Sequence, residues 1–125
     1  MTWLWIALGG ALGSISRHGV SLALARFDSF PASTLAANAA GSLLIGFAAG
    51  YWEVDQRKSA FALFLITGFC GGFTTFSTFS LQTLELIQNN EWMKAGSNIV
   101  ASVILCLAFT AAGWWCSHAV IRGTP

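Results

Sequence analysis

Four apolar runs, each about as long as a membrane helix, make up most of this chain. The runs are Trp3–Ala25, Ser33–Trp52, Ala60–Gln88 and Ser97–His118. A helix needs about 20 mainly apolar residues to cross a bilayer. Charged residues make up 9% of the chain, against about 25% in a soluble domain. We therefore predict an all-α membrane protein in which four transmembrane helices form a single domain over residues 1–125.

The short connections between the runs hold most of the charge. They contain Arg26 and Asp28, then Glu53, Asp55, Arg57 and Lys58, and finally Glu91 and Lys94. The formal net charge is +1, which provides no large basic surface for a nucleic acid. We therefore expect the lipid bilayer, and no nucleic acid, to be the surroundings that this chain contacts.

The sequence contains no constellation of catalytic residues. His18 and His118 lie a hundred residues apart, and neither has an obvious carboxylate partner. Motifs such as GxSxG, HExxH and the phosphate-binding loop are absent from the sequence. Cys70, Cys106 and Cys116 lie in apolar runs without CxxC spacing, which favours free thiols over a metal site. We predict that the protein is not an enzyme.

The third run contains an unusual stretch, Thr67–Ser80, with the sequence TGFCGGFTTFSTFS. Its Gly71-Gly72 pair lowers helix propensity, and its hydroxyls offer the backbone competing hydrogen bonds. Non-helical backbone at membrane depth survives only where protein or a water-filled cavity satisfies it. We predict a third helix that is broken at its centre, with the break as the functional site. The alternative is a close-packed helix interface, because membrane helices also approach each other through Gly, Ser and Thr.

Polar residues follow one face of each of the other runs. In the second run Asn38 shares a face with Thr34, Gly41 and Ser42 by helical spacing. The fourth run has a polar stripe at every fourth residue, comprising Asn98, Ser102, Cys106 and Thr110. Such a stripe forms either the wall of an aqueous path or a packed helix seam, and the spacing leaves both open. For Asn38 we favour the aqueous path.

The first run combines a packing face with one embedded charge. Gly9 and Gly13 have the GxxxG spacing of close helix contacts. Arg17 follows them, and it either extends its charge to the membrane surface or anchors a partner helix and attracts an anion. No acidic residue lies at a membrane midplane, so a proton-coupled carrier would lack its titrating group. Phe76 and Phe79 lie three residues apart, and the positive edges of their rings would favour a small anion.

Three motifs together resemble the Fluc (CrcB-type) fluoride channels. They are GGALGSISR in the first run, NAAGSLLIG in the second and GFCGGFTTFSTFS in the third. The resemblance covers the whole chain. It implies four-helix subunits that pair as an antiparallel (dual-topology) homodimer in the cell inner membrane. Such dimers export fluoride passively from the cytoplasm through two pores.

The resemblance also implies roles for particular residues. Phe76 and Phe79 would line the pores with their ring edges, and Asn38 would donate a hydrogen bond to the ion. Further pore residues would be Ser77, Ser80, Ser102 and Thr110. The backbone carbonyls of Gly71 and Thr74 would hold a central, structural sodium ion. Gln82 departs from the family, which often has Glu at this position.

The charges in the connections support insertion in both orientations. With four spans, one side of the membrane receives Arg57, Lys58 and Arg122, and the other receives Arg26 and Lys94. Because lysine and arginine bias sets orientation, three against two gives almost no preference. A second, inverted copy would then supply the symmetry that longer transporters build within one chain.

Two other functions suit a chain of this length and helix count. A small four-helix multidrug exporter would carry an embedded acidic residue in its first helix, where this chain has Arg17 instead. A non-transporting helix-bundle subunit would use the same Gly and Ser faces for packing only. Anion flux through the purified protein separates the channel from this second alternative.

Overall fold

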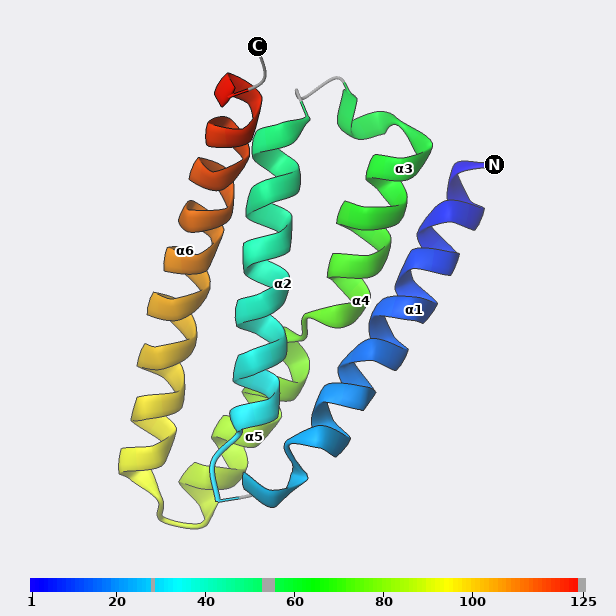
Figure 1. Cartoon of the computed structure of the whole chain (residues 1–125). Helices are drawn as coiled ribbons and strands as arrows, with labels where there is room; N and C mark the ends of the chain where they lie inside the picture. Colours follow the sequence, from blue (N-terminus) through cyan, green and yellow to red (C-terminus); the bar gives the residue numbers. More distant parts are fainter. Residues whose placement is uncertain (28, 53–55, 124–125) are drawn as a thin grey trace.

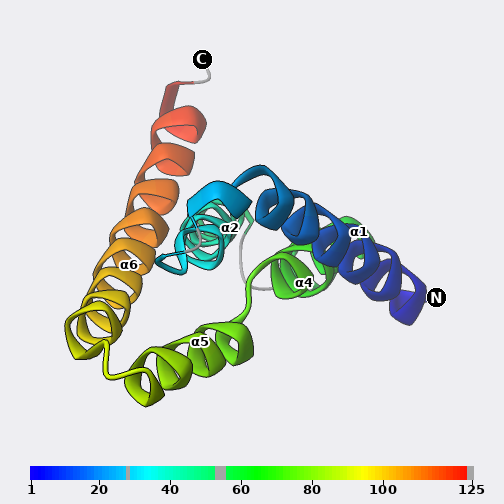
Figure 2. The same ribbon diagram turned by 90° about the horizontal axis from the view of Figure 1, so that it is seen from below.

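The computed structural model describes residues 1–27, 29–52 and 56–123, and its regular secondary structure in these ranges is helical. Asp28, Glu53 and Asp55, which we assigned to connections, lie outside the described residues. The long helices are α1 (Thr2–Ala23), α2 (Ala32–Tyr51) and α6 (Trp92–Gly123), with the 3₁₀ turns η1 (Ala25–Phe27) and η2 (Gln56–Lys58) between them. They lie side by side, with α2 between α6 and α1 (Figures 1 and 2).

Three helical stretches in the described ranges are long and apolar enough to cross a membrane. They are Ala32–Tyr51, Ala60–Gln88 and Trp92–Gly123, which identifies the chain as a membrane protein. The last stretch is longer at both ends than the predicted Ser97–His118. It begins directly after a tight turn in which Asn90 has a φ of 61°, a conformation that asparagine tolerates better than most residues.

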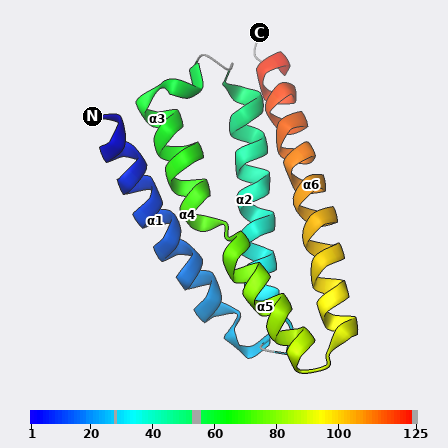
Figure 3. The ribbon, with the colours of Figure 1, turned by 180° about the vertical axis from the view of Figure 1, so that it is seen from behind.

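The third stretch consists of several segments with an interruption. It comprises α3 (Ala60–Ala62), the π-helix η3 (Leu63–Cys70), α4 (Gly71–Phe73) and α5 (Phe76–Gln88). Thr74 and Thr75 between α4 and α5 are extended, with ψ angles of 156° and 115°. The helical conformation therefore ends at Phe73 and resumes at Phe76 (Figure 3).

The glycine pair is helical, and the interruption follows it. A Cβ on Gly72 would overlap the Gly10 carbonyl oxygen, so this glycine lets α4 approach α1 closely. Glycine costs a helix only about 1 kcal/mol relative to alanine, which such packing readily offsets. The new start at α5 is stabilised by Thr75, whose Oγ1 accepts a hydrogen bond from the Thr78 N–H at 3.1 Å. Threonine is a favoured residue at a helix N-terminus for this reason.

Glycines also form the two long seams between helices. A Cβ on Gly9 or Gly13 of α1 would overlap a carbonyl oxygen of η3, so this face packs within the subunit. In the second seam, a Cβ on Gly46 of α2 would overlap the Thr110 carbonyl. A Cβ on Gly113 of α6 would likewise overlap the Leu43 carbonyl. Both seams are of the small-residue kind that membrane helices use.

Candidate functional site

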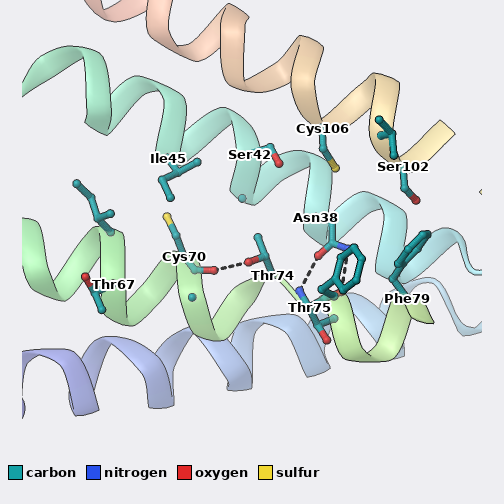
Figure 4. Close-up of a pocket in the computed structure, with 15 residues that line it drawn as sticks. Asn38, Ser42, Ile45, Thr67, Cys70, Thr74, Thr75, Phe79, Ser102 and Cys106 are labelled. Carbon is teal, nitrogen blue, oxygen red and sulfur yellow. Dashed lines mark hydrogen bonds between the residues drawn. The ribbon is translucent and has the colours of Figure 1, made fainter. Parts of the chain in front are cut away.

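The interruption is held in place by the side chain of Asn38 on α2. Its Nδ2 donates to the Thr75 carbonyl at 3.0 Å, and its Oδ1 accepts from the Thr75 N–H at 2.7 Å (Figure 4). The amide thus satisfies both backbone groups of Thr75, which have no helical partner in the extended conformation. Asn38 therefore points toward the third stretch and tethers α2 to the start of α5.

The interruption leaves backbone carbonyls without their helical donors, and those of Gly71 and Thr74 are two of them. In a continuous helix the Gly71 carbonyl would accept from the Thr75 N–H, which is bonded to Asn38 instead. The Thr74 carbonyl would accept from the Thr78 N–H, which is bonded to Thr75 Oγ1. The described residues contain no group of three His, Cys, Asp or Glu side chains that suits a metal. Backbone carbonyls such as these two are oxygen ligands of the kind that a hard cation prefers.

A cavity of about 440 Å³ opens beside the interruption. It brings together six of the predicted pore and cation residues, namely Asn38, Gly71, Thr74, Phe76, Phe79 and Ser102. The remaining lining residues are Gly41, Ser42, Ile45, Ile66, Thr67, Cys70, Thr75, Val103 and Cys106. In the described part of the chain no charged side chain lines this cavity. Its chemistry is therefore that of amide, hydroxyl, carbonyl and thiol groups among apolar surfaces.

One hydroxyl in this cavity lacks a protein partner. Ser102 on α6 is only 8% exposed, and its Oγ makes no hydrogen bond with any described residue. Leaving such a buried group unsatisfied costs about 1–3 kcal/mol. In Figure 4 Ser102 and Phe79 project from α6 and α5 at the same end of the cavity. The Ser102 hydroxyl is therefore available as a hydrogen-bond donor or acceptor beside the cavity.

The two predicted aromatic residues lie together at the start of α5. The ring centroids of Phe76 and Phe79 are 5.2 Å apart, and their planes are inclined by 46°. The Phe76 side chain is 79% exposed in the single subunit, whereas Phe79 is half-buried. The Phe pair therefore forms one open wall of the cavity.

Three predicted pore residues do not line this cavity within one subunit. Ser80 Oγ donates to the Phe76 carbonyl at 2.9 Å, and Thr110 Oγ1 donates to the Cys106 carbonyl at 2.8 Å. Ser77 Oγ lies 3.2 Å from Thr75 Oγ1. The position of Thr110 follows from helix geometry, because a four-residue spacing drifts by about 40° per step. Thr110 is thus turned away from the cavity that Ser102 enters.

Two polar cavities lie nearer the α1–α2 connection. Half-buried Arg17 lines one of about 230 Å³ together with Ser14, His18, Ser21, Thr34, Thr75 and Thr78. Gln82 lines the other, of about 430 Å³, and its buried Oε1 has no hydrogen-bond partner in the described chain. Charged residues Glu85, Glu91 and Lys94 line this second cavity as well.

The sequence did not single out Thr75, which is the partner of Asn38 and the N-cap of α5. For Asn38 the sequence favoured the wall of an aqueous path over a helix contact. It contained no signal for the hydrogen bonds between Asn38 and Thr75, because the two positions are 37 residues apart. Ile66 in the cavity wall was not predicted, and Thr67 was predicted only as the first residue of the Thr67–Ser80 stretch, since π-helical turns change which residues share a face.

Known proteins match this chain over most of its length. Residues 4–114 match the family described as CrcB-like protein, Camphor Resistance (CrcB). A protein of Opitutus terrae named fluoride-specific ion channel FluC is 44% identical over 126 residues, covering 97% of this chain and 92% of its own. A protein of the same name from Paramagnetospirillum magneticum is 46% identical over 112 residues, covering 86% and 88% of the two chains.

A third relative, from Gluconobacter oxydans and also named fluoride-specific ion channel FluC, is 46% identical over 117 residues, covering 90% of this chain and 81% of its own. These names describe ion channels and not enzymes. The resemblance drawn from the three motifs is confirmed, and the family match over residues 4–114 with such identities across nearly whole chains shows that this chain belongs to the CrcB family.

Proposed function

We propose that this chain forms a channel that lets fluoride leave the cytoplasm passively. The observation that carries the proposal is the unpartnered Ser102 hydroxyl in a cavity that also contains Asn38 and the Phe pair. The names of relatives more than two-fifths identical to this chain support fluoride as the ion. Several helices suited to crossing a bilayer support a location in the cell membrane.

Fluoride is small and tightly hydrated, so the path must replace its water with strong donors. Asn38 uses one Nδ2–H for Thr75, and its second N–H remains for an ion. The Ser102 hydroxyl is a second donor, and the ring edges of the Phe pair carry partial positive charge. Because no charged side chain of the described residues lines the cavity, fluoride would be held weakly enough to leave again. The larger chloride ion would meet a path too narrow for it.

The complete channel would be an antiparallel homodimer in the inner membrane, with four spans in each subunit. The exposure of Phe76 supports a second copy, and so does the open space around Gly71, where a Cβ would meet no atom within 4 Å. Each of two pores would draw on both subunits. Ser77, Ser80 and Thr110 would then contribute hydroxyls through that interface. Terminal tags should label from both sides of the membrane, and labelling from one side in every molecule would contradict this arrangement.

A structural sodium ion fits the backbone at the interruption. The Gly71 and Thr74 carbonyls lack their helical donors, and both residues line the same cavity. Two copies would offer about four oxygen ligands, which suits a hard cation. Such an ion would supply a fixed positive charge that lowers the cost of a nearby anion.

The direct test is ion efflux from liposomes that contain only the purified protein. We expect rapid release of fluoride and negligible release of chloride at equal gradients. Protein that is folded and inserted but releases neither ion would favour the non-transporting bundle. Release of organic cations driven by a proton gradient would favour the multidrug exporter.

A further inference from the structure

Helix α5 carries both phenylalanines of the cavity, yet it packs sparsely within the subunit. Large side chains along it, such as Leu81 and Leu84, are exposed. Figure 2 shows α5 leaving the tight turn before α6 at an open angle, like one arm of a V. The direction in which the Phe pair points therefore depends on the few contacts that hold α5.

One of these contacts is a buried relay of hydrogen bonds from α6. Asn98 on α6 is 1% exposed, and its Nδ2 donates to Thr83 Oγ1 on α5 at 2.9 Å. Thr83 is 7% exposed, and its Oγ1 donates in turn to the Phe79 carbonyl at 2.7 Å. The amide of α6 is thus connected through one hydroxyl to the backbone of a cavity residue.

The relay also fixes the register between the two antiparallel helices. Thr83 lies one turn after Phe79 on α5, and Asn98 lies one turn before Ser102 on α6. The pairing of Thr83 with Asn98 therefore puts Phe79 opposite Ser102 as the next pair, and both of these line the cavity. One turn further, Thr75 and Cys106 line it as well. The Thr83–Asn98 pair therefore joins α5 to α6 directly beside the two pairs of residues that line the cavity.

We propose that Asn98 is a positioning residue for the ion path, acting through Thr83 on Phe79. This inference rests on the proposed fluoride channel and assigns Asn98 a role other than lining the path. Turning α5 by one residue would rotate its side chains by about 100° and move Phe79 out of the cavity. That rotation would leave the buried Asn98 amide without its acceptor, so the relay opposes it. A single buried asparagine is known to specify helix register in this way.

The test compares five variants, four single and one double, in fluoride-loaded and chloride-loaded liposomes. Asn98→Leu and Thr83→Val should each lower fluoride efflux about tenfold, the effect of losing one buried hydrogen bond, and should raise the chloride share of the flux. Thr83→Ser keeps the hydroxyl, so its fluoride efflux and its chloride share of the flux should stay near those of the parent. Ser117→Ala is the matched control, because Ser117 is a fully buried hydroxyl on α6 that bonds to the Trp114 carbonyl away from the cavity.

Thermal unfolding of the same variants separates positioning from mere stability. Thr83→Val should be the least stable, because it leaves the buried Asn98 amide unpaired. The double variant Asn98→Leu/Thr83→Val should regain stability, since both polar partners are gone. Its fluoride efflux and selectivity should nevertheless remain impaired.

The outcomes distinguish this inference from the function on which it rests. If the parent releases no fluoride, the channel function itself fails. If the parent conducts and the double variant regains parental flux and selectivity, apolar packing alone positions α5, and the positioning role is wrong. The positioning role would also be wrong if Asn98→Leu matched the parent in fluoride efflux and selectivity.

Discussion

The α2–α6 seam and the interruption at Thr74–Thr75 use similar small and polar residues with opposite results. The seam packs closely, whereas the interruption leaves open space beside it. In the seam, Gly46 and Gly113 bring backbone against backbone, so closely that a Cβ would overlap a carbonyl. At the interruption, Asn38 and Thr75 redirect backbone hydrogen bonds to side chains. The seam has no room for a methyl group, whereas a cavity of about 440 Å³ adjoins the interruption.

The two neighbouring glycines of the third stretch show the same difference at the scale of one residue. Gly72 faces the Gly10 carbonyl without space for a side chain, whereas a Cβ on Gly71 would meet no atom within 4 Å. A glycine therefore allows two helices to pack closely where it faces the backbone of another helix. Where it faces no neighbouring segment, it leaves open space. The composition of a membrane helix alone does not separate these two cases.

Substitution in the seam should have the largest effect. Gly113→Ala would drive its Cβ into the Leu43 carbonyl, and because that atom is backbone it yields only if α2 moves. We expect a loss of about 3 kcal/mol of folding free energy or more, from overpacking. Thermal unfolding in detergent measures it. Gly96→Ala on the same helix is the control, since no atom lies within 4 Å of its Cβ. Equal stability of the two variants would contradict the close approach of α2 and α6.

Substitution of the tether should affect ion flux more than folding. Asn38→Asp keeps an acceptor for the Thr75 N–H but removes the donor to the Thr75 carbonyl. We expect a stability loss of about 1–2 kcal/mol from the one lost bond. Fluoride efflux should fall at least about a hundredfold, because a carboxylate would repel the anion where a donor is needed. Efflux near the parental rate would exclude Asn38 from the path.

Replacing the aromatic wall should leave the fold intact and reduce conduction moderately. Phe76→Ile and Phe79→Ile approximately conserve apolar volume, and such swaps usually cost less than about 1.5 kcal/mol. The loss of the positive ring edges should lower fluoride efflux about tenfold, if each edge contributes about 1.4 kcal/mol of ion stabilisation. Gel filtration and thermal unfolding check that the variants are intact. Unchanged efflux in both variants would mean that the rings belong to the apolar packing, as in the seam.

The sequence predicted most of the helices and several inward-facing residues, because apolar run length and helical spacing determine these. It predicted the packing face of Gly9 and Gly13. The family resemblance placed Asn38, Ser102 and the Phe pair along a pore, and in the structure these four residues line one cavity. The positions of the interruption and of the ends of α6 were less predictable. Both depend on contacts between distant segments, such as Gly72 with Gly10, which no local propensity encodes.

The smallest effect should come from changing the cation and not the protein. If the Gly71 and Thr74 carbonyls hold a structural sodium ion, replacing sodium by a large organic cation should empty the site. The helices would remain packed, because the seams contain no ion ligands. The anion path would lose a fixed positive charge, and we expect fluoride efflux to fall several-fold, the effect of about 1 kcal/mol across a partly shielded distance. Returning sodium should restore the rate within the same sample. Equal fluoride efflux before and after the exchange would mean that protein groups, and not sodium, satisfy the Gly71 and Thr74 carbonyls. The interruption would then differ from the α2–α6 seam only in how closely its residues pack.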